Sequence, residues 1–92
     1  MSLATTLSGL LARSAAERRT VPWTLGKGLR VRVTTGPPRL CLWREDGAWG
    51  PGEASEREGR VCAAQLGWSA YDLRWQGRYL IVEQQAPLLG QT

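Results

Sequence analysis

Apolar and polar side chains alternate in two segments of the chain, residues 29–44 and 71–83. Each segment is interrupted by turn-forming residues, Gly-Pro-Pro in the first and Gln-Gly in the second. Because successive side chains of a strand point to opposite faces, each segment predicts a β-hairpin with one apolar and one polar face. A two-residue turn at Gln76-Gly77 in the second hairpin would place Leu73 opposite Leu80.

Two further segments, residues 2–19 and 55–66, repeat apolar side chains at helical spacing. Ser55 and Glu58 have the spacing of a capping box at the start of the second helix, and Gly67 can end it in a left-handed conformation. The stripe on the first helix indicates either a core face or a dimer interface. Its members are Leu3, Leu7, Leu10, Leu11 and Ser14.

The order helix, hairpin, helix, hairpin predicts one small α+β domain of the order α-β-β-α-β-β. We expect a four-stranded antiparallel sheet with two helices packed on one face. Val21-Pro22 should end the first helix, and residues 23–28 should form a linker. Residues 45–54 read as a loop, whose Trp49 either covers a core edge or stacks on a ligand. Residues 86–92 read as a tail.

The polar faces of the two hairpins would form one surface if both hairpins join the same sheet. Arginines and aromatic rings on a sheet can bind single-stranded nucleic acid, because the cations hold phosphates and the rings stack on bases. Asp72 and Glu83 fall on the same face and reduce its positive potential. The candidate binding residues are Arg30, Arg32, Arg39, Trp43, Arg74 and Tyr79, with Ile81 beside them.

The alternative is a protein-interaction or homodimerisation module with no role in nucleic-acid binding. Interface cores are enriched in aromatic and arginine side chains, as this sheet face is. A chain of 92 residues also buries a modest core, which favours assembly. The homodimer could form through the sheet face or through the helix stripe of Leu3, Leu7, Leu10 and Leu11.

Net charge fits either hypothesis. The chain has 12 basic and 8 acidic residues, a formal charge of +4, and Lys27 is its only lysine. Arginine suits phosphate and base contacts. The codons of a GC-rich, bacterial-like genome would give the same arginine-rich composition without selection for nucleic acid.

Enzymatic chemistry has little support in the sequence. The chain lacks histidine, the commonest general base. Cys41 has no visible base partner, and Cys62 lies on the packing face of its helix. The two cysteines form no CxxC pair, and Gly26-Lys27-Gly28 matches no phosphate-binding loop. We therefore expect no enzyme, no cofactor, no metal and no membrane segment, and a cytoplasmic protein with reduced thiols.

Overall fold

The computed structural model describes residues 2–45 and 49–85, arranged as two helices and one antiparallel sheet. The predicted α+β class is therefore confirmed, whereas the predicted number of strands is wrong, because the sheet has five. A single 3-10 turn, Gly26–Gly28, follows the first strand. The elements are α1 (Leu3–Glu17), β1 (Val21–Thr24), β2 (Arg30–Thr34), β3 (Arg39–Trp43), α2 (Glu53–Gln65), β4 (Tyr71–Gln76) and β5 (Tyr79–Gln84).

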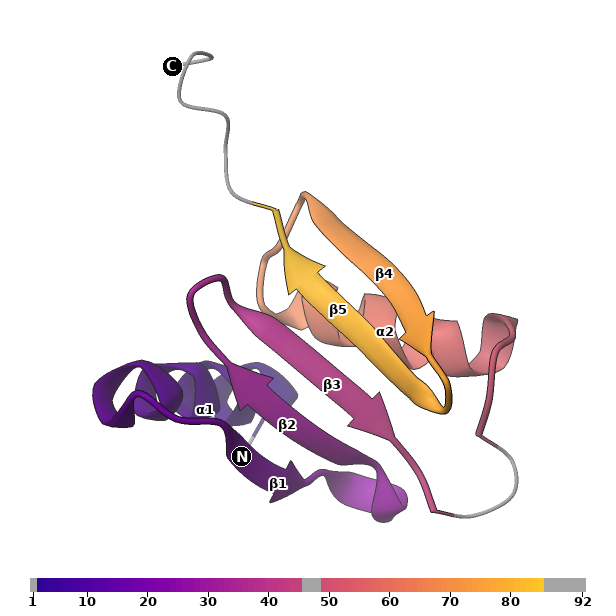
Figure 1. Ribbon diagram of the computed structural model, residues 1–92, viewed down its shortest axis with the longest axis horizontal. Helices are drawn as coiled ribbons and strands as arrows, with labels where there is room; N and C mark the ends of the chain where they lie inside the picture. The colour runs from indigo at the N-terminus through magenta and orange to yellow at the C-terminus, as the bar shows by residue number, and fades with distance from the viewer. Residues whose placement is uncertain (1, 46–48, 86–92) are drawn as a thin grey trace.

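The additional strand is β1, in the segment predicted as a helix end and a linker. It pairs antiparallel with β2, so that Val21 faces Val33 across the ladder. Proline cannot donate to a ladder, but Pro22 is tolerated because β1 lies at the edge of the sheet. The strand order is β1-β2-β3-β5-β4, so the two predicted hairpins meet through their second strands (Figure 1).

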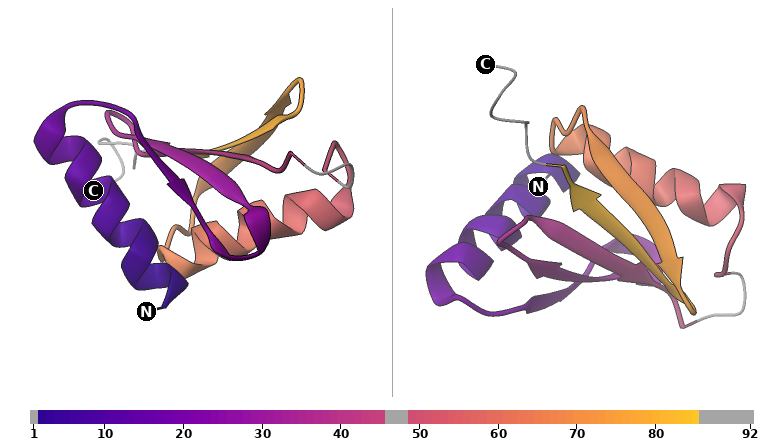
Figure 2. Two further views of the ribbon diagram at one scale, coloured as in Figure 1. Left: turned by 90° about the horizontal axis from the view of Figure 1, so that it is seen from below. Right: turned by 45° about the horizontal axis from the view of Figure 1, so that its top comes forward.

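Both helices lie on the same face of the sheet, as predicted (Figure 2). α1 packs on β1 and β2, while α2 packs on β4 and β5 and also touches α1. The core lies between the helices and the sheet, and apolar burial of this kind is the main stabilising term. The opposite face is covered by no described element. The largest side chains without solvent exposure are Leu7, Leu40, Leu42 and Leu80.

The leucine stripe of α1 belongs to the core of the same chain. Leu7 and Leu10 are buried, and Leu3 and Leu11 pack against the core while partly exposed. Leu7 and Leu10 of the stripe therefore belong to the core, as the first interpretation predicts, while Leu3 and Leu11 keep part of their surface exposed. The helix starts after Ser2, whose hydroxyl accepts a hydrogen bond from the backbone of the first turn.

The predicted capping box at the start of α2 is wrong. The helix begins at Glu53 with Gly52 as its N-cap, and no side chain caps it. Ser55 lies inside the first turn, where it is buried and its hydroxyl accepts from the backbone N–H of Gly50 at 3.4 Å. Glu58 lies 4.0 Å from Arg44 instead of reaching back to Ser55.

The predicted end of α2 is confirmed. Gly67 has a φ of 75°, and its N–H donates to the carbonyl of Ala64 at 3.0 Å. The next residue, Trp68, is buried and donates from its backbone N–H to Ala63 at 2.9 Å. These two bonds form a Schellman motif, whose C-terminal apolar residue packs back onto the helix.

The second hairpin turns at Gly77-Arg78 instead of Gln76-Gly77. Gly77 has a φ of 61° and is the first central residue of the turn, as in type II′ geometry. Leu73 therefore faces Val82 and not Leu80. A shift of two residues keeps every side chain on its face, so the assignment of the apolar and polar faces is unaffected.

Trp49 covers an edge of the core, the structural one of its two predicted roles. Its ring centroid lies 5.7 Å from that of Trp75, and its Nε1 donates to the carbonyl of Arg78 at 2.8 Å. Cys62 is buried, as expected. The predicted tail, residues 86–92, lies outside the described residues, as do residues 46–48 of the predicted loop.

Candidate functional site

The six candidate residues all lie on the sheet face that the helices leave open. We call this surface the outer face. The strand pairings align Arg32, Cys41, Ile81 and Arg74 in one row across β2, β3, β5 and β4. The outer face consists of Pro22, Thr24, Arg30, Arg32, Thr34, Arg39, Cys41, Trp43, Asp72, Arg74, Gln76, Tyr79, Ile81 and Glu83.

Three of these side chains form a cluster on the outer face, near the end of β3 and the start of β5. The Cζ atom of Arg32 lies 4.9 Å from the centroid of the Trp43 ring, which is a cation–π distance. The rings of Trp43 and Tyr79 meet edge to face, with centroids 5.6 Å apart and an interplanar angle of 73°. Within residues 2–45 and 49–85, the Arg32 guanidinium makes no ion pair, so no carboxylate of that part of the chain neutralises its charge.

Ile81 is buried although it lies on the outer face, with 4% of its surface exposed. No described element covers this face, so the side chains that surround Ile81 on the same strands must enclose it. The outer face therefore presents arginine side chains and the partly exposed rings of Trp43 and Tyr79 to solvent, while neighbouring side chains cover Ile81.

One end of the outer face is neutralised by ion pairs. The Glu83 carboxylate accepts from Arg39 at 2.9 Å and from Arg74 at 3.4 Å. Asp72 accepts from Arg74 at 2.8 Å, a hydrogen bond that raises the pKa of the Arg74 guanidinium, to which Glu83 also contributes. Positive charge is thus concentrated at the other end, near Arg30 and Arg32.

A hollow of about 160 Å³ adjoins that basic end. Arg30 and Trp43 form one side of it, and Pro22, Trp23 and Thr24 of the edge strand form the other. Trp23 is 48% exposed and Val61 is 44% exposed, and these are the two large hydrophobic side chains that are exposed in the described part of the chain. The linker prediction missed these three residues. The signal for a strand there was β-branched Val and Thr around a proline, a pattern compatible with an edge strand.

The charge of Arg30, unlike that of Arg32, is partly neutralised by an ion pair. Its Nη1 lies 3.6 Å from Glu45, an exposed pair that contributes little energy and is readily screened by salt. An incoming phosphate can therefore compete with Glu45 for this guanidinium at small cost.

Cys41 lies between the basic groups but is not activated by them. Burial raises the pKa of its thiol, and the opposing effects of Arg32 and Arg39 are smaller. The thiolate is the nucleophilic form, so at neutral pH Cys41 is a poor nucleophile. The outer face thus offers cation and ring contacts, and its Cys41 thiol is not activated as a nucleophile.

Within residues 2–45 and 49–85, no group of three or more histidine, cysteine or carboxylate side chains could hold a metal ion. None of the helices in that part of the chain has the length and apolar character needed to cross a membrane. Comparison of the chain with protein-family models, curated proteins and solved structures finds no match. We therefore infer a function from the geometry of the described residues.

Proposed function

We propose that the outer face binds single-stranded nucleic acid at the cluster of Arg32, Trp43 and Tyr79. The observation that carries this proposal is the unpaired Arg32 guanidinium stacked on the Trp43 ring, on a sheet face free of helices. Proteins recognise unstacked bases by stacking them on aromatic rings or on guanidinium planes. A base would extend the stack from Arg32 or from the exposed part of Trp43.

The basic end supplies phosphate contacts next to this stack. Arg30 lies two residues before Arg32 on β2, so both side chains point to the outer face about 7 Å apart along the strand. A strand of nucleic acid whose base stacks at the cluster would place a neighbouring phosphate near Arg30. The face is a sheet and not a projecting helix or ribbon, so it suits unpaired bases better than the duplex major groove.

A labelled oligonucleotide of mixed sequence would test the proposal by fluorescence anisotropy at 50 mM salt. Each base–aromatic stack contributes about 1–3 kcal/mol, so Trp43→Ala should weaken binding about 5- to 150-fold. The double variant Arg32→Ala/Trp43→Ala should abolish measurable binding while its thermal unfolding stays cooperative. Absence of binding by the unmodified chain at 50 mM salt would refute the proposal.

Arg57→Ala is the matched control for lost charge. Arg57 lies on α2, on the other side of the molecule, and its side chain is 73% exposed. The variant Arg57→Ala should leave the affinity for the oligonucleotide unchanged. The variant Arg32→Ala should weaken binding and should also reduce the slope of log K against log salt by about 0.7. Equal losses for Arg32→Ala and Arg57→Ala would indicate nonspecific attraction to a basic protein.

A protein-interaction module is the second candidate, favoured by exposed Trp23 on the edge strand β1. An open edge presents unpaired backbone groups, to which a second strand can add. Light scattering across a wide concentration range distinguishes the two candidates. A dimer that Trp23→Ser dissociates, together with no oligonucleotide binding, would favour this alternative.

A further inference from the structure

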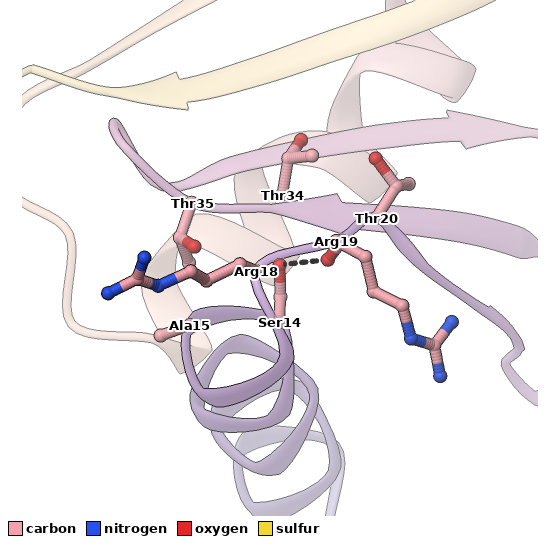
Figure 3. Close-up of a pocket in the computed structure, with 7 residues that line it drawn as sticks. All are labelled: Ser14, Ala15, Arg18, Arg19, Thr20, Thr34 and Thr35. Carbon is pink, nitrogen blue, oxygen red and sulfur yellow. Dashed lines mark hydrogen bonds between the residues drawn. The ribbon is translucent and has the colours of Figure 1, made fainter.

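A second and larger hollow, of about 340 Å³, lies where α1 ends beside the start of β1 and the end of β2 (Figure 3). Two arginines and three threonines line it, which makes its wall rich in hydrogen-bond donors. The side chains that bear on its chemistry are Ser14, Arg18, Arg19, Thr20, Thr34 and Thr35.

Most of these donors have no partner among the described residues. Within residues 2–45 and 49–85, the hydroxyls of Thr20, Thr34 and Thr35 make no hydrogen bond, and the Arg18 guanidinium makes neither a hydrogen bond nor an ion pair. Figure 3 shows the Arg18 side chain extending past Thr35 on one side of the hollow. Unpaired donors around a hollow suit a ligand that carries several acceptor oxygens.

The other polar groups of the hollow are already engaged. The Ser14 hydroxyl donates to the carbonyl of Arg19 at 2.6 Å. The Arg19 side chain extends to the opposite side from Arg18 (Figure 3), where its Nε donates to Glu17 at 2.6 Å. Hydrogen bonds from Arg13 and then from Arg19 lower the pKa of Glu17, so this carboxylate stays ionised and holds Arg19 away. Arg18 is therefore the free cation of the hollow.

The backbone of Arg18 has a strained, left-handed conformation at a position where glycine is the usual residue. It ends α1 with a φ of 54° and is the one non-glycine residue with positive φ among those described. Glycine is the usual residue at such a helix end, because a side chain there is disfavoured. Strained residues of this kind cluster at functional sites, where the side chain is needed.

We propose that this hollow binds a phosphate group. The Arg18 guanidinium would pair with two phosphate oxygens in bidentate fashion, and the threonine hydroxyls would donate to the remaining oxygens. The C-terminal end of α1 opposes an anion, an effect that is reduced in part because the Ser14 carbonyl already accepts a hydrogen bond from the backbone N–H of Arg18. The phosphate site does not depend on the nucleic-acid proposal.

The phosphate can come from two sources, a free phosphate ion or the backbone of a nucleic acid. Thr34 belongs both to the hollow and to the outer face, and it follows Arg32 by two residues on β2. The distance along the strand is about 7 Å. A strand bound at the Arg32 cluster could therefore place a backbone phosphate in the hollow.

The first arm of the test is an NMR titration of the full chain with sodium phosphate, against sodium chloride at equal ionic strength. Saturable shifts should be confined to the amides of residues 18–20 and 34–35. Arg18→Gly should weaken this response about tenfold or more, since it removes the charged contact. It should not lower the melting temperature, because glycine relaxes the backbone at this position. Arg57→Gln, with the same loss of charge on α2, should leave the titration unchanged.

The second arm measures oligonucleotide binding by the same variants. A tenfold loss for Arg18→Gly in this arm would identify the ligand as a backbone phosphate. Dependence on Arg18 in the phosphate titration alone would identify a free phosphate ion. If the unmodified chain binds phosphate but no oligonucleotide, the phosphate site stands and the outer-face function fails. If neither arm depends on Arg18, the phosphate site is refuted, whatever the outer face binds.

Discussion

Two glycines within helices provide a direct test of how α2 packs beneath β4 and β5. Gly59 is buried in α2, and a methyl group added there would lie 2.9 Å from Cδ2 of Leu80 and 3.1 Å from Cγ2 of Val82. Gly9 is exposed in α1, and an added methyl group would have no neighbour within 4 Å. Replacement by alanine should therefore have opposite effects at the two positions.

The magnitudes follow from two competing terms. Alanine gains about 0.8–1 kcal/mol over glycine in a helix interior, and this gain applies at both positions. Overpacking costs about 1–3 kcal/mol and applies only at Gly59, because Leu80 and Val82 are fully buried and cannot move into solvent. Gly9→Ala should raise the free energy of unfolding by about 0.5–1 kcal/mol. Gly59→Ala should lower it by about 1 kcal/mol.

Urea denaturation at 25 °C, followed by far-UV circular dichroism, measures both changes. A difference of about 2 kcal/mol would also separate the melting temperatures of the two variants by about 8–16 °C in a domain of this size. If Gly59→Ala stabilised the protein as much as Gly9→Ala, α2 would not pack closely on β5. The assignment of the outer face as uncovered would then be wrong, because it requires both helices to pack on the opposite face of the sheet.

Three further outcomes are expected. Glu83→Gln should release its two arginine partners on the outer face and tighten oligonucleotide binding in anisotropy titrations, at a cost in stability below about 1 kcal/mol; weaker binding would contradict the electrostatic reasoning. Trp75→Phe removes the indole hydrogen bond to the Glu56 carboxylate, 2.9 Å long, and should lower the free energy of unfolding by about 1–2 kcal/mol in urea denaturation; an unchanged value would mean that water replaces it without loss. Burial raises the pKa of Cys62 from 9.0 to about 11, so the folded chain holds this proton more tightly than the unfolded chain does. The stability that this protonated thiol contributes is present below about pH 9 and is lost towards pH 11. Over that interval the free energy of unfolding of the unmodified protein should fall by up to about 2–3 kcal/mol more than that of Cys62→Ala. Parallel pH profiles of the two proteins would refute this.

Alternation of side chains identified the faces of both hairpins but could not identify the register of the second. Gln76-Gly77 and Gly77-Arg78 are both two-residue turns that contain the glycine, and they differ by a shift of two residues in pairing. Such a shift leaves each side chain on its original face, so the hydrophobic pattern is equally satisfied by both. The turn geometry, with positive φ at the first central residue, decides between them.

The elements that sequence patterns missed depend on contacts with distant segments. β1 has four residues, one of them Pro22, and it becomes a strand because β2 offers it a free edge. Ser55 fits a capping box by spacing alone. The preceding segment, held where Trp49 packs on Trp75, leads into a helix that begins earlier, at Glu53.

The candidate site was predictable to the extent that it depends on local pairing. Arg32 and Trp43 come from one hairpin with a short turn, and they lie diagonally across neighbouring strands on one face. The contact of Trp43 with Tyr79 and the ion pair of Arg39 with Glu83 require β3 to pair with β5. No pattern in the sequence specifies which strands of the two hairpins meet.

The pairing of β3 with β5 also has a consequence for how the chain folds. The other three strand pairings join segments that are close in sequence, whereas this one joins residues 39–42 to residues 80–83 across a loop that includes α2. Closing that loop costs chain entropy before the contacts between β3 and β5 can stabilise the chain. We therefore expect the folding nucleus to contain this junction. Truncating Leu40 or Val82 should slow folding, and truncating side chains of β1 should mainly accelerate unfolding.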